Sequence, residues 1–324
     1  MRVLRVGVIG CGSIARAVHL PVLRRIPGVV LAAVADIDPA ALEAVRRTAP
    51  SAALCRDAAG LLARADLDAV VVTAPSGLHA ELALAVAGAG RHLYLEKPLA
   101  TTHSDGEAVV AAAAKAGIVA AIGFNRRFHP AIRRARSVVR AGGIGRVGHV
   151  SATFTDGGEL PAWKLARADG GGALLDLASH HVDLVRFLLD AEIEAVEATM
   201  TSTRSEHDGA IMQLRLTDGA EAELQVGFRA PQVDVLELTG SRGAVRIDRH
   251  TGRVTRRPQR LAPTGALALL RLRLLVRPDS DPSYALALRA FVARVRGDDV
   301  ELPTLEDGLA SLLVVLAAEE AAAS

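Results

Sequence analysis

The sequence predicts a two-domain α/β protein whose first domain is built on a doubly wound parallel sheet. Short, continuously apolar runs alternate with helical patterns through residues 1–122, as expected for parallel strands covered by helices on both faces. The pattern then changes, and the stretch from 195 to 256 is typical of consecutive strands joined by turns. A chain of 324 residues also exceeds what one small core usually carries. We therefore expect two domains, 1–122 and 123–324.

The elements of the first domain follow from its apolar runs and helical periodicity. Strands are predicted at Arg5–Ile9, Val29–Ala35, Ala69–Thr73, His92–Leu95 and Val119–Ile122. Helical patterns between them cover Ile14–Arg25, Pro39–Arg47, Leu61–Arg64, His79–Ala89 and Ser104–Ala116.

The second domain mixes helices with a strand-rich stretch. It is predicted to begin with a helix, a strand and a strongly apolar helix, at Pro130–Ala141, Gly148–Phe154 and Ala173–Leu189. A loop with Gly157, Gly158 and Pro161 is expected after the strand. Turn signals at Thr217–Gly219 and Gly240–Gly243 divide the strand-rich stretch, which suggests an antiparallel or mixed sheet with one face against helices. Helices over Ser283–Arg296 and Leu305–Ala323 end the chain, and we expect the last one to pack on the first domain.

An apolar and arginine-rich run, residues 266–277, lies between prolines near the end of this domain. It fits an amphipathic helix at a subunit contact or a membrane surface. It also fits an ordinary surface helix between loops, which is the interpretation we favour.

Composition excludes several classes of protein. The net charge is +2 with both signs mixed along the chain, unlike the concentrated basic surface of a nucleic-acid binder. No uncharged apolar stretch reaches the length of a membrane span, and the glycine-interrupted start does not resemble a signal peptide. Two cysteines, Cys11 and Cys55, argue against a disulfide framework. We expect a soluble cytoplasmic protein with no metal site and no membrane or nucleic-acid partner.

A glycine-rich turn follows the first predicted strand, in the sequence VGVIGCGSIA. Gly10 permits the tight turn, Gly12 lets the backbone approach a pyrophosphate, and Ala15 is small enough for the helix to sit close to the sheet. The helix start, including Ser13 and Ile14, would hold the anion through its N–H groups. Because strand, turn, helix and next strand are all present, this turn predicts a Rossmann dinucleotide-binding domain.

An aspartate, Asp36, ends the second strand 21 residues after Ala15. Its carboxylate can accept hydrogen bonds from the adenosine ribose and would repel a 2′-phosphate. Ile37 follows instead of a basic residue, so NAD is favoured over NADP as the cofactor. The alternative is that Asp36 and Asp38 only shape the turn, and both roles can coexist.

Polar residues follow the third predicted strand, in TAPSGLHAE. Ligands of such sheets bind outside the carboxyl ends of the strands, so we expect Thr73, Pro75 and Ser76 near the nicotinamide. His79 is a further candidate for cofactor contact, although a histidine at a helix start is more often structural.

Lysine is scarce, since only Lys97, Lys115 and Lys164 occur among 38 basic residues. Lys97 follows Glu96 where the fourth strand leaves the sheet, and both are candidates for cofactor contact. A lysine there can stabilise a developing alkoxide or polarise a carbonyl oxygen. The alternative is a solvated lysine paired with Glu96.

Four ionisable residues occur within the largely apolar helix of the sequence GGGALLDLASHHVDL. Asp176 and His180 are four residues apart and therefore share a helical face. Histidine can remove a hydroxyl proton while hydride leaves the carbon, and Asp176 can orient the imidazole or contact the substrate. The alternative is a core histidine satisfied by its carboxylate. His181 and Asp183 are interpreted as structural.

These blocks resemble the glucose–fructose oxidoreductase, inositol dehydrogenase and rhizopine-catabolism (Gfo/Idh/MocA) family. GVIGCGSIA, TAPSGLHAE, LEKPLA, GFNRRFHPAI and GGGALLDLASHHVDL follow the order of the family's blocks, so the resemblance covers essentially the whole chain. It implies a Rossmann domain and a C-terminal α/β domain with an open, mostly antiparallel sheet. Relatives often form homodimers or homotetramers through that sheet.

The resemblance also implies functional residues. Lys97, Asp176 and His180 match the family's catalytic lysine, aspartate and histidine, and the bond before Pro98 is often cis in relatives. Asn125 and Arg126 match positions near the substrate crevice, and Trp163 is a candidate for stacking on a sugar ring. Ser76 and Gly77 replace the more usual asparagine and larger residue, and His129 stands where aspartate is common. These departures bear on the fine shape of the site, not on its chemistry.

The expected activity is NAD-dependent hydride transfer to or from a secondary hydroxyl or keto carbon of a sugar, cyclitol or related polyol. Two enzyme alternatives are an NADP-linked ketosugar reductase of a biosynthetic pathway and an enzyme that cycles tightly bound NAD between two substrates. A non-catalytic NAD-binding sensor would keep Gly10, Gly12 and Asp36 without needing Lys97 or His180.

Overall fold

The computed structural model describes residues 2–203, 205, 207–228, 231–258, 265, 269–270 and 281–323. Contacts divide the chain into two compact units. Unit 1 comprises Met1–Phe124 and Tyr284–Leu312, and unit 2 comprises Asn125–Ser283 and Leu313–Ser324.

Unit 1 is built on a sheet of parallel strands in the order β3-β2-β1-β4-β5-β6. The strands are β1 (Leu4–Ile9), β2 (Val29–Ala35), β3 (Ala53–Cys55), β4 (Ala69–Val72), β5 (His92–Leu95) and β6 (Ala120–Ile122). The strand order reverses between β1 and β4, which is the point where doubly wound sheets bind their ligands. The predicted parallel fold is confirmed. β3 is an additional edge strand, which was not predicted because a run of three residues is too short to be recognised in the sequence.

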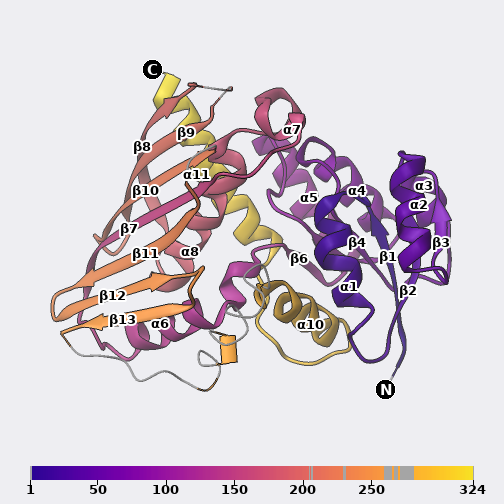
Figure 1. Cartoon of the computed structure of the whole chain (residues 1–324), viewed down its shortest axis with the longest axis horizontal. Helices are drawn as coiled ribbons and strands as arrows, with labels where there is room; N and C mark the ends of the chain where they lie inside the picture. The colour runs from indigo at the N-terminus through magenta and orange to yellow at the C-terminus, as the bar shows by residue number, and fades with distance from the viewer. Residues whose placement is uncertain are drawn as a thin grey trace. The chain divides into compact units, whose positions relative to one another are not determined.

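Helices of unit 1 surround this sheet, as the indigo and purple elements of Figure 1 show. After the glycine-rich turn, a π-helical turn at Ala15–His19 continues into α1 (Leu20–Leu23). The others are α2 (Pro39–Thr48), α3 (Ala58–Leu62), α4 (His79–Gly88), α5 (His103–Ala116) and α10 (Ser283–Val295). The last helix, α11 (Leu305–Ala323), is divided between the units.

Local chemistry fixes the ends of these helices. The Asp38 carboxylate accepts the N–H of Ala40 at 2.8 Å and caps α2, whose first residue is Pro39. Thr102 caps α5 by accepting the N–H of Asp105 at 3.2 Å, and Gly117 ends that helix with φ of 61°.

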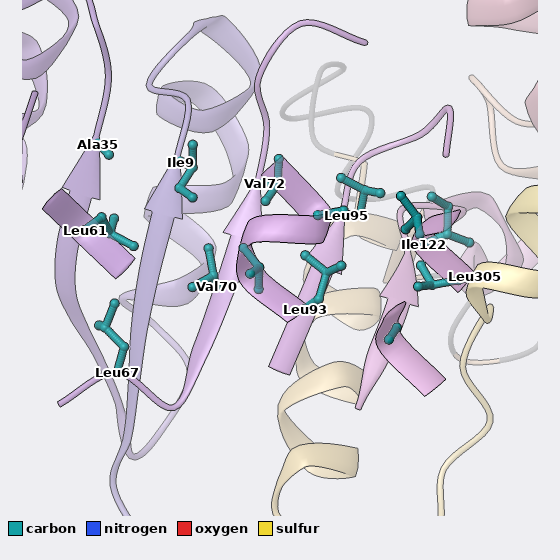
Figure 2. Close-up of a cluster of buried hydrophobic side chains, with 14 of the residues drawn as sticks. Ile9, Ala35, Leu61, Leu67, Val70, Val72, Leu93, Leu95, Ile122 and Leu305 are labelled. Carbon is teal, nitrogen blue, oxygen red and sulfur yellow. The ribbon is translucent and has the colours of Figure 1, made fainter. Parts of the chain in front are cut away.

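The core of unit 1 is a cluster of aliphatic side chains from the sheet and its helices (Figure 2). Ile9, Val70, Val72, Leu93 and Leu95 project from three adjacent strands, and each is at most 5% exposed. Leu61, Leu67 and Leu305 belong to the same cluster. Burial of this aliphatic surface is the main favourable contribution to folding here.

Unit 2 contains a sheet in the order β13-β12-β11-β7-β10-β9-β8. Its strands are β7 (Val147–Asp156), β8 (Ile193–Thr201), β9 (Gly209–Leu216), β10 (Glu221–Phe228), β11 (Val233–Gly240), β12 (Gly243–Asp248) and β13 (Arg253–Arg257). Neighbouring strands are antiparallel except β7 and β10, which are parallel. Buried and exposed residues alternate along β9, so one face of the sheet is buried. The predicted mostly antiparallel sheet is confirmed.

The helices of unit 2 are α6 (Pro130–Arg140), α7 (Ala162–Leu165) and α8 (Ser179–Leu189), and α6 and α8 pack on each other and on the sheet. Two differences from the expectation bear on the site. The predicted helix at Ala173–Leu189 begins with a π-helical turn, Leu174–Ala178, and the predicted loop before it contains α7. Single π-helical turns occur frequently at functional sites.

The arginine-rich run at 266–277 lies almost wholly outside the described residues, so neither interpretation of it is tested. Among the helices that are described, none has both the length and the apolar character needed to cross a bilayer.

Candidate active site

The glycine-rich turn packs directly against the residues that follow β4. Gly10 has φ of +90°, and a Cβ there would lie 2.7 Å from the backbone of Thr73 and Ala74. The Thr73 hydroxyl donates to the Gly10 carbonyl oxygen at 2.7 Å. Only glycine fits the first position, and Thr73 holds the turn at the switch point of the sheet.

The remaining residues of the turn leave an open surface. A Cβ on Gly12 would meet no atom within 4 Å, so a ligand can approach the backbone there. Ser13 is exposed and Ile14 is half-buried at the helix start. Ala15 is fully buried, which lets the helix sit close to the sheet. These features match the requirements for holding a pyrophosphate.

Asp36 shapes the turn in which it lies and also braces the glycine-rich turn. Its carboxylate accepts the N–H of Cys11 at 2.6 Å and the N–H of Asp38 at 2.8 Å. Asp36 is half-buried. The next residue in the sequence is Ile37, which is 85% exposed and uncharged, so no basic side chain directly follows Asp36. Burial, with the nearby charge of Asp36, raises the pKa of the Cys11 thiol to about 12.

His79 connects the loop after β4 with the loop after β5. Its Nδ1 lies 2.6 Å from the carbonyl oxygen of Pro98, and its Nε2 lies 2.9 Å from that of Ala74. The ring is 1% exposed, and burial lowers its pKa below the ordinary value despite those two acceptors. The geometry is that of a structural histidine. Pro75 is exposed and Ser76 is 3% exposed in the same loop.

Lys97 lies half-buried in the loop after β5, and its bond to Pro98 is cis, as the resemblance implied. The preceding Glu96 is 8% exposed, and its carboxylate lies 2.8 Å from Nε2 of His19. It also accepts the N–H of Lys97 at 3.3 Å. Gly123 makes room for this carboxylate, since a Cβ there would lie 2.8 Å from it.

The pairing of Glu96 with His19 was not predicted from the sequence. Burial alone would raise the pKa of Glu96, but the hydrogen bond and charge of His19, with Lys97, hold it below the ordinary 4.5. His19 is fully buried in the helix that follows the glycine-rich turn. The sequence did contain a signal for this pairing, because a buried glutamate needs a polar partner and the helix after the glycine-rich turn offers His19.

In unit 2, Asp176 and His180 are 3% and 6% exposed on the segment that follows the triple-glycine turn. Asp176 lies in the π-helical turn and His180 in the first turn of α8. The ammonium of Lys164 donates to Asp176 at 2.8 Å. Trp163, the neighbour of Lys164 in α7, is half-buried, and its ring centroid lies 5.6 Å from that ammonium.

The neighbours of these two residues are held by arginines. Arg127 contacts both carboxylate oxygens of Asp183 from its Nε, at 3.0 and 2.9 Å, which anchors α8. His181 is 1% exposed and lies 3.9 Å from Asp234, and burial together with Arg126 lowers its pKa to about 3. Their contacts are those of structural residues.

Asn125 and Arg126 lie in the interior of unit 2. Asn125 donates to the hydroxyl of Ser283 at 2.6 Å. Arg126 lies 3.2 Å from Asp234 and 3.8 Å from the centroid of the Phe154 ring. Burial would raise the pKa of Asp234, but Arg126 and Arg249 hold it well below the ordinary value. His129 is 1% exposed beside this network and caps α6, and burial lowers its pKa to about 4.

Metal ligation has no support among the described residues, which contain no cluster of three or more histidine, cysteine or acidic side chains with suitable geometry.

Two sequence-family models match the chain. One, an oxidoreductase family with an NAD-binding Rossmann fold, matches residues 4–124, and the other, the GFO/IDH/MocA C-terminal domain, matches 132–246. The chain belongs to the Gfo/Idh/MocA family. It is an oxidoreductase with an NAD-binding Rossmann domain, as the sequence predicted.

Relatives of this family member span most of its length. The 1,5-anhydro-D-fructose reductase of Ensifer adhaerens is 32% identical over 271 residues, which cover 80% of this chain and 78% of the relative. The myo-inositol 2-dehydrogenase of Thermotoga maritima is 28% identical over 328 residues, covering 98% and 96%. The structure of the WlbA dehydrogenase from Bordetella pertussis, in complex with NADH and UDP-GlcNAcA, superposes with a TM-score of 0.88 at 25% identity, covering 99% and 96%.

The buried Glu96 should stabilise the fold in a pH-dependent way. Glu96→Gln should lower the free energy of unfolding by about 1–3 kcal/mol at neutral pH, because it removes a charged hydrogen-bond acceptor from His19. A lowered folded-state pKa adds stability above pH 4.5, and this stability is lost as the pH falls through the folded-state value. In urea unfolding over a pH series from neutral to about 3, the difference between wild type and variant should therefore shrink below pH 4.5.

Glu81→Gln removes an exposed carboxylate of α4 and is the matched control. It should change the free energy of unfolding by less than about 0.5 kcal/mol. A Glu96→Gln effect that stays constant across the pH series would contradict the assignment.

Proposed function

We propose that this oxidoreductase is an NAD(H)-dependent dehydrogenase that oxidises or reduces one secondary hydroxyl or keto carbon of a sugar, cyclitol or related polyol. The observation that carries the proposal is the pair of buried ionisable residues, Asp176 and His180, which share one face of a largely apolar helical segment. The names of the relatives, which act on an anhydrosugar and on inositol, support the same substrate class.

The residues of unit 1 fit a dinucleotide. The unfilled space beside Gly12 and the helix start at Ser13 suit a pyrophosphate, and Asp36 suits the ribose hydroxyls. Asp36 keeps acceptor capacity beyond its two backbone hydrogen bonds, since a carboxylate offers about four lone-pair sites. Thr73, Pro75 and Ser76 lie at the carboxyl end of β4, where the nicotinamide is expected.

The proposed chemistry divides among three side chains. When bound, NAD supplies the hydride acceptor, so both electrons of the broken C–H bond leave with the hydride. His180 takes the hydroxyl proton as the C–O bond gains double-bond character. The Lys97 ammonium stabilises the negative charge that develops on that oxygen, and Asp176 stabilises the imidazolium or orients the substrate. In the reverse direction, His180 returns the proton.

Other residues are proposed to shape the substrate side. Trp163 offers a half-buried ring on which the apolar face of a sugar can stack. Asn125 and Arg126 are proposed to act indirectly, by supporting the interior of unit 2. Asn125 is hydrogen-bonded to Ser283, and Arg126 contacts Asp234 and the ring of Phe154.

Two residues test the proposed chemistry directly. Lys97→Met and His180→Ala should each lower kcat by about 100-fold or more. Each removes a group that acts in the transition state, Lys97 by stabilising the charge on the oxygen and His180 by accepting the proton. NAD binding, measured by quenching of the protein's fluorescence or by calorimetry, should stay within a few-fold of wild type. Activity is followed at the nicotinamide absorbance near 340 nm with a panel of polyols.

Lys115→Met, which removes an exposed lysine of α5, is the control and should leave kcat unchanged. Wild-type rates in both site variants would contradict the roles proposed for Lys97 and His180. A wild type that binds NAD but turns over no polyol would favour the non-catalytic sensor.

The cofactor preference is proposed to be NAD, on account of Asp36. Asp36→Ser should lower kcat/KM for NAD by about tenfold or more and raise it for NADP, because the carboxylate no longer binds the ribose or repels the phosphate. Comparing both cofactors with one substrate measures this. An unchanged ratio would favour the NADP-linked reductase. Conversion of one substrate only when a second is present, without free NAD, would favour the enzyme with tightly bound cofactor.

We also propose a cytoplasmic location and assembly into a homodimer or homotetramer through the exposed face of the unit 2 sheet. Both described cysteines are free, which fits a reducing compartment. The exposed face of β9 carries Ile211, which is 46% exposed, beside Gln213 and Arg215.

Light scattering after size exclusion should give two or four times the chain mass of 33.8 kDa. Ile211→Glu should shift the population toward 33.8 kDa by placing a buried charge in the contact. A wild type that elutes at the mass of one chain would contradict this assembly.

A further inference from the structure

One of the three lysines, Lys164, contacts a residue of the proposed catalytic set. Its ammonium donates to Oδ2 of Asp176 at 2.8 Å. The Asp176 side chain is 5% exposed, whereas 26% of the Lys164 side chain remains accessible. A carboxylate buried this deeply is expensive unless a counter-charge and hydrogen bonds compensate it.

The backbone holds Lys164 in place independently of this ion pair. The N–H of Gly172 donates to the carbonyl oxygen of Lys164 at 2.9 Å, and the N–H of Gly171 donates to Ala166 at 3.0 Å. A Cβ on Gly171 would collide with the backbone carbonyls of Lys164 and Trp163, so only glycine permits this approach. Helix α7 is therefore fastened to the turn that leads directly into the segment bearing Asp176.

Arg167 and His207 also lie near the triple-glycine turn that precedes Asp176. Arg167 donates to Glu319 at 2.7 and 2.8 Å, so its guanidinium is already committed. His207 approaches the triple-glycine turn, where its carbonyl accepts the N–H of Ala173 at 2.8 Å. His180 follows on the same helical segment. Lys164 is a cation in direct contact with the Asp176 carboxylate.

We propose that Lys164 is a positioning residue, which keeps Asp176 ionised and fixes its carboxylate for the proton transfer at His180. The inference rests on the proposed dehydrogenase function. A negative Asp176 stabilises the imidazolium that forms when His180 takes the substrate proton. Without Lys164, the buried carboxylate loses one charged hydrogen bond, so both its ionised form and its position are less favoured and that stabilisation weakens.

The kinetic test compares two substitutions at one position. Lys164→Met should lower kcat by roughly 10- to 100-fold, the range expected for losing one charged hydrogen bond. The KM for NAD should stay within a few-fold of the wild-type value, because α7 belongs to unit 2 and the residues proposed to bind NAD belong to unit 1. Lys164→Arg keeps the charge and the donor and should recover most of the lost rate. Lys115→Met, on an exposed face of α5, should behave as wild type.

Folding of the variants is checked at the adjacent side chain. Trp163 is the sole tryptophan, so its emission reports whether α7 remains docked. An unaltered spectrum with lowered kcat supports the positioning role. Wild-type kcat in Lys164→Met, or equal losses in the Met and Arg variants with a shifted spectrum, would overturn it.

A second test does not depend on turnover. With three lysines in the chain, acetic anhydride labelling read by mass spectrometry resolves each of them. Lys164 should react more slowly than exposed Lys115, and Asp176→Asn should speed labelling of Lys164 several-fold while leaving Lys115 unchanged. If Lys164 is labelled at the same rate in the wild type and in Asp176→Asn, the proposed ion pair is overturned. An intact pair in a wild type that oxidises no polyol overturns the proposed function alone.

Discussion

The cost of burying charge in an aliphatic interior governs how both units are arranged. Aromatic residues make up only 3% of the chain, so the cores consist mainly of alanine, valine, leucine and isoleucine, which offer buried charges no polar contacts. Three buried carboxylates accordingly lie beside cations or histidine: Glu96 beside His19, Asp176 beside Lys164, and Asp183 beside Arg127. Each pair lies on, or next to, a segment that carries a proposed catalytic group. The pairs therefore place these groups as well as compensating their charges.

On the cofactor side, hydrogen bonds likewise hold the glycine-rich turn in place. Thr73 fastens the glycine-rich turn to the end of β4, and Asp36 fastens it to the end of β2. His79 then joins the loops after β4 and β5. Hydrogen bonds within the protein thus connect the ends of β2, β4 and β5 around the glycine-rich turn. Such preorganisation reduces the entropy that a bound dinucleotide would otherwise have to fix.

Much of the fold could be predicted because its signals are local. The strands Val29–Ala35 and His92–Leu95 and the helix Leu305–Ala323 have the bounds that the sequence indicated, since apolar runs and periodicity define them. The π-helical turns at Ala15–His19 and Leu174–Ala178 could not be predicted, because one inserted residue barely disturbs an apolar pattern. Glu96 lies 77 residues from His19, and that pairing exists only once helix and sheet have packed. The choice of Lys164 as the partner of Asp176 depends likewise on α7, which was expected to be a loop.

We propose that Lys97, Asp176 and His180 act on one carbon of a polyol beside the nicotinamide. A crystal structure with NAD and a polyol that the enzyme turns over tests this most directly. We predict one substrate oxygen within hydrogen-bond distance of both the Lys97 ammonium and the His180 imidazole, with its carbon facing the nicotinamide and Asp36 on the adenosine ribose. A polyol bound with its reacting carbon away from His180, or a ribose that does not contact Asp36, would contradict it.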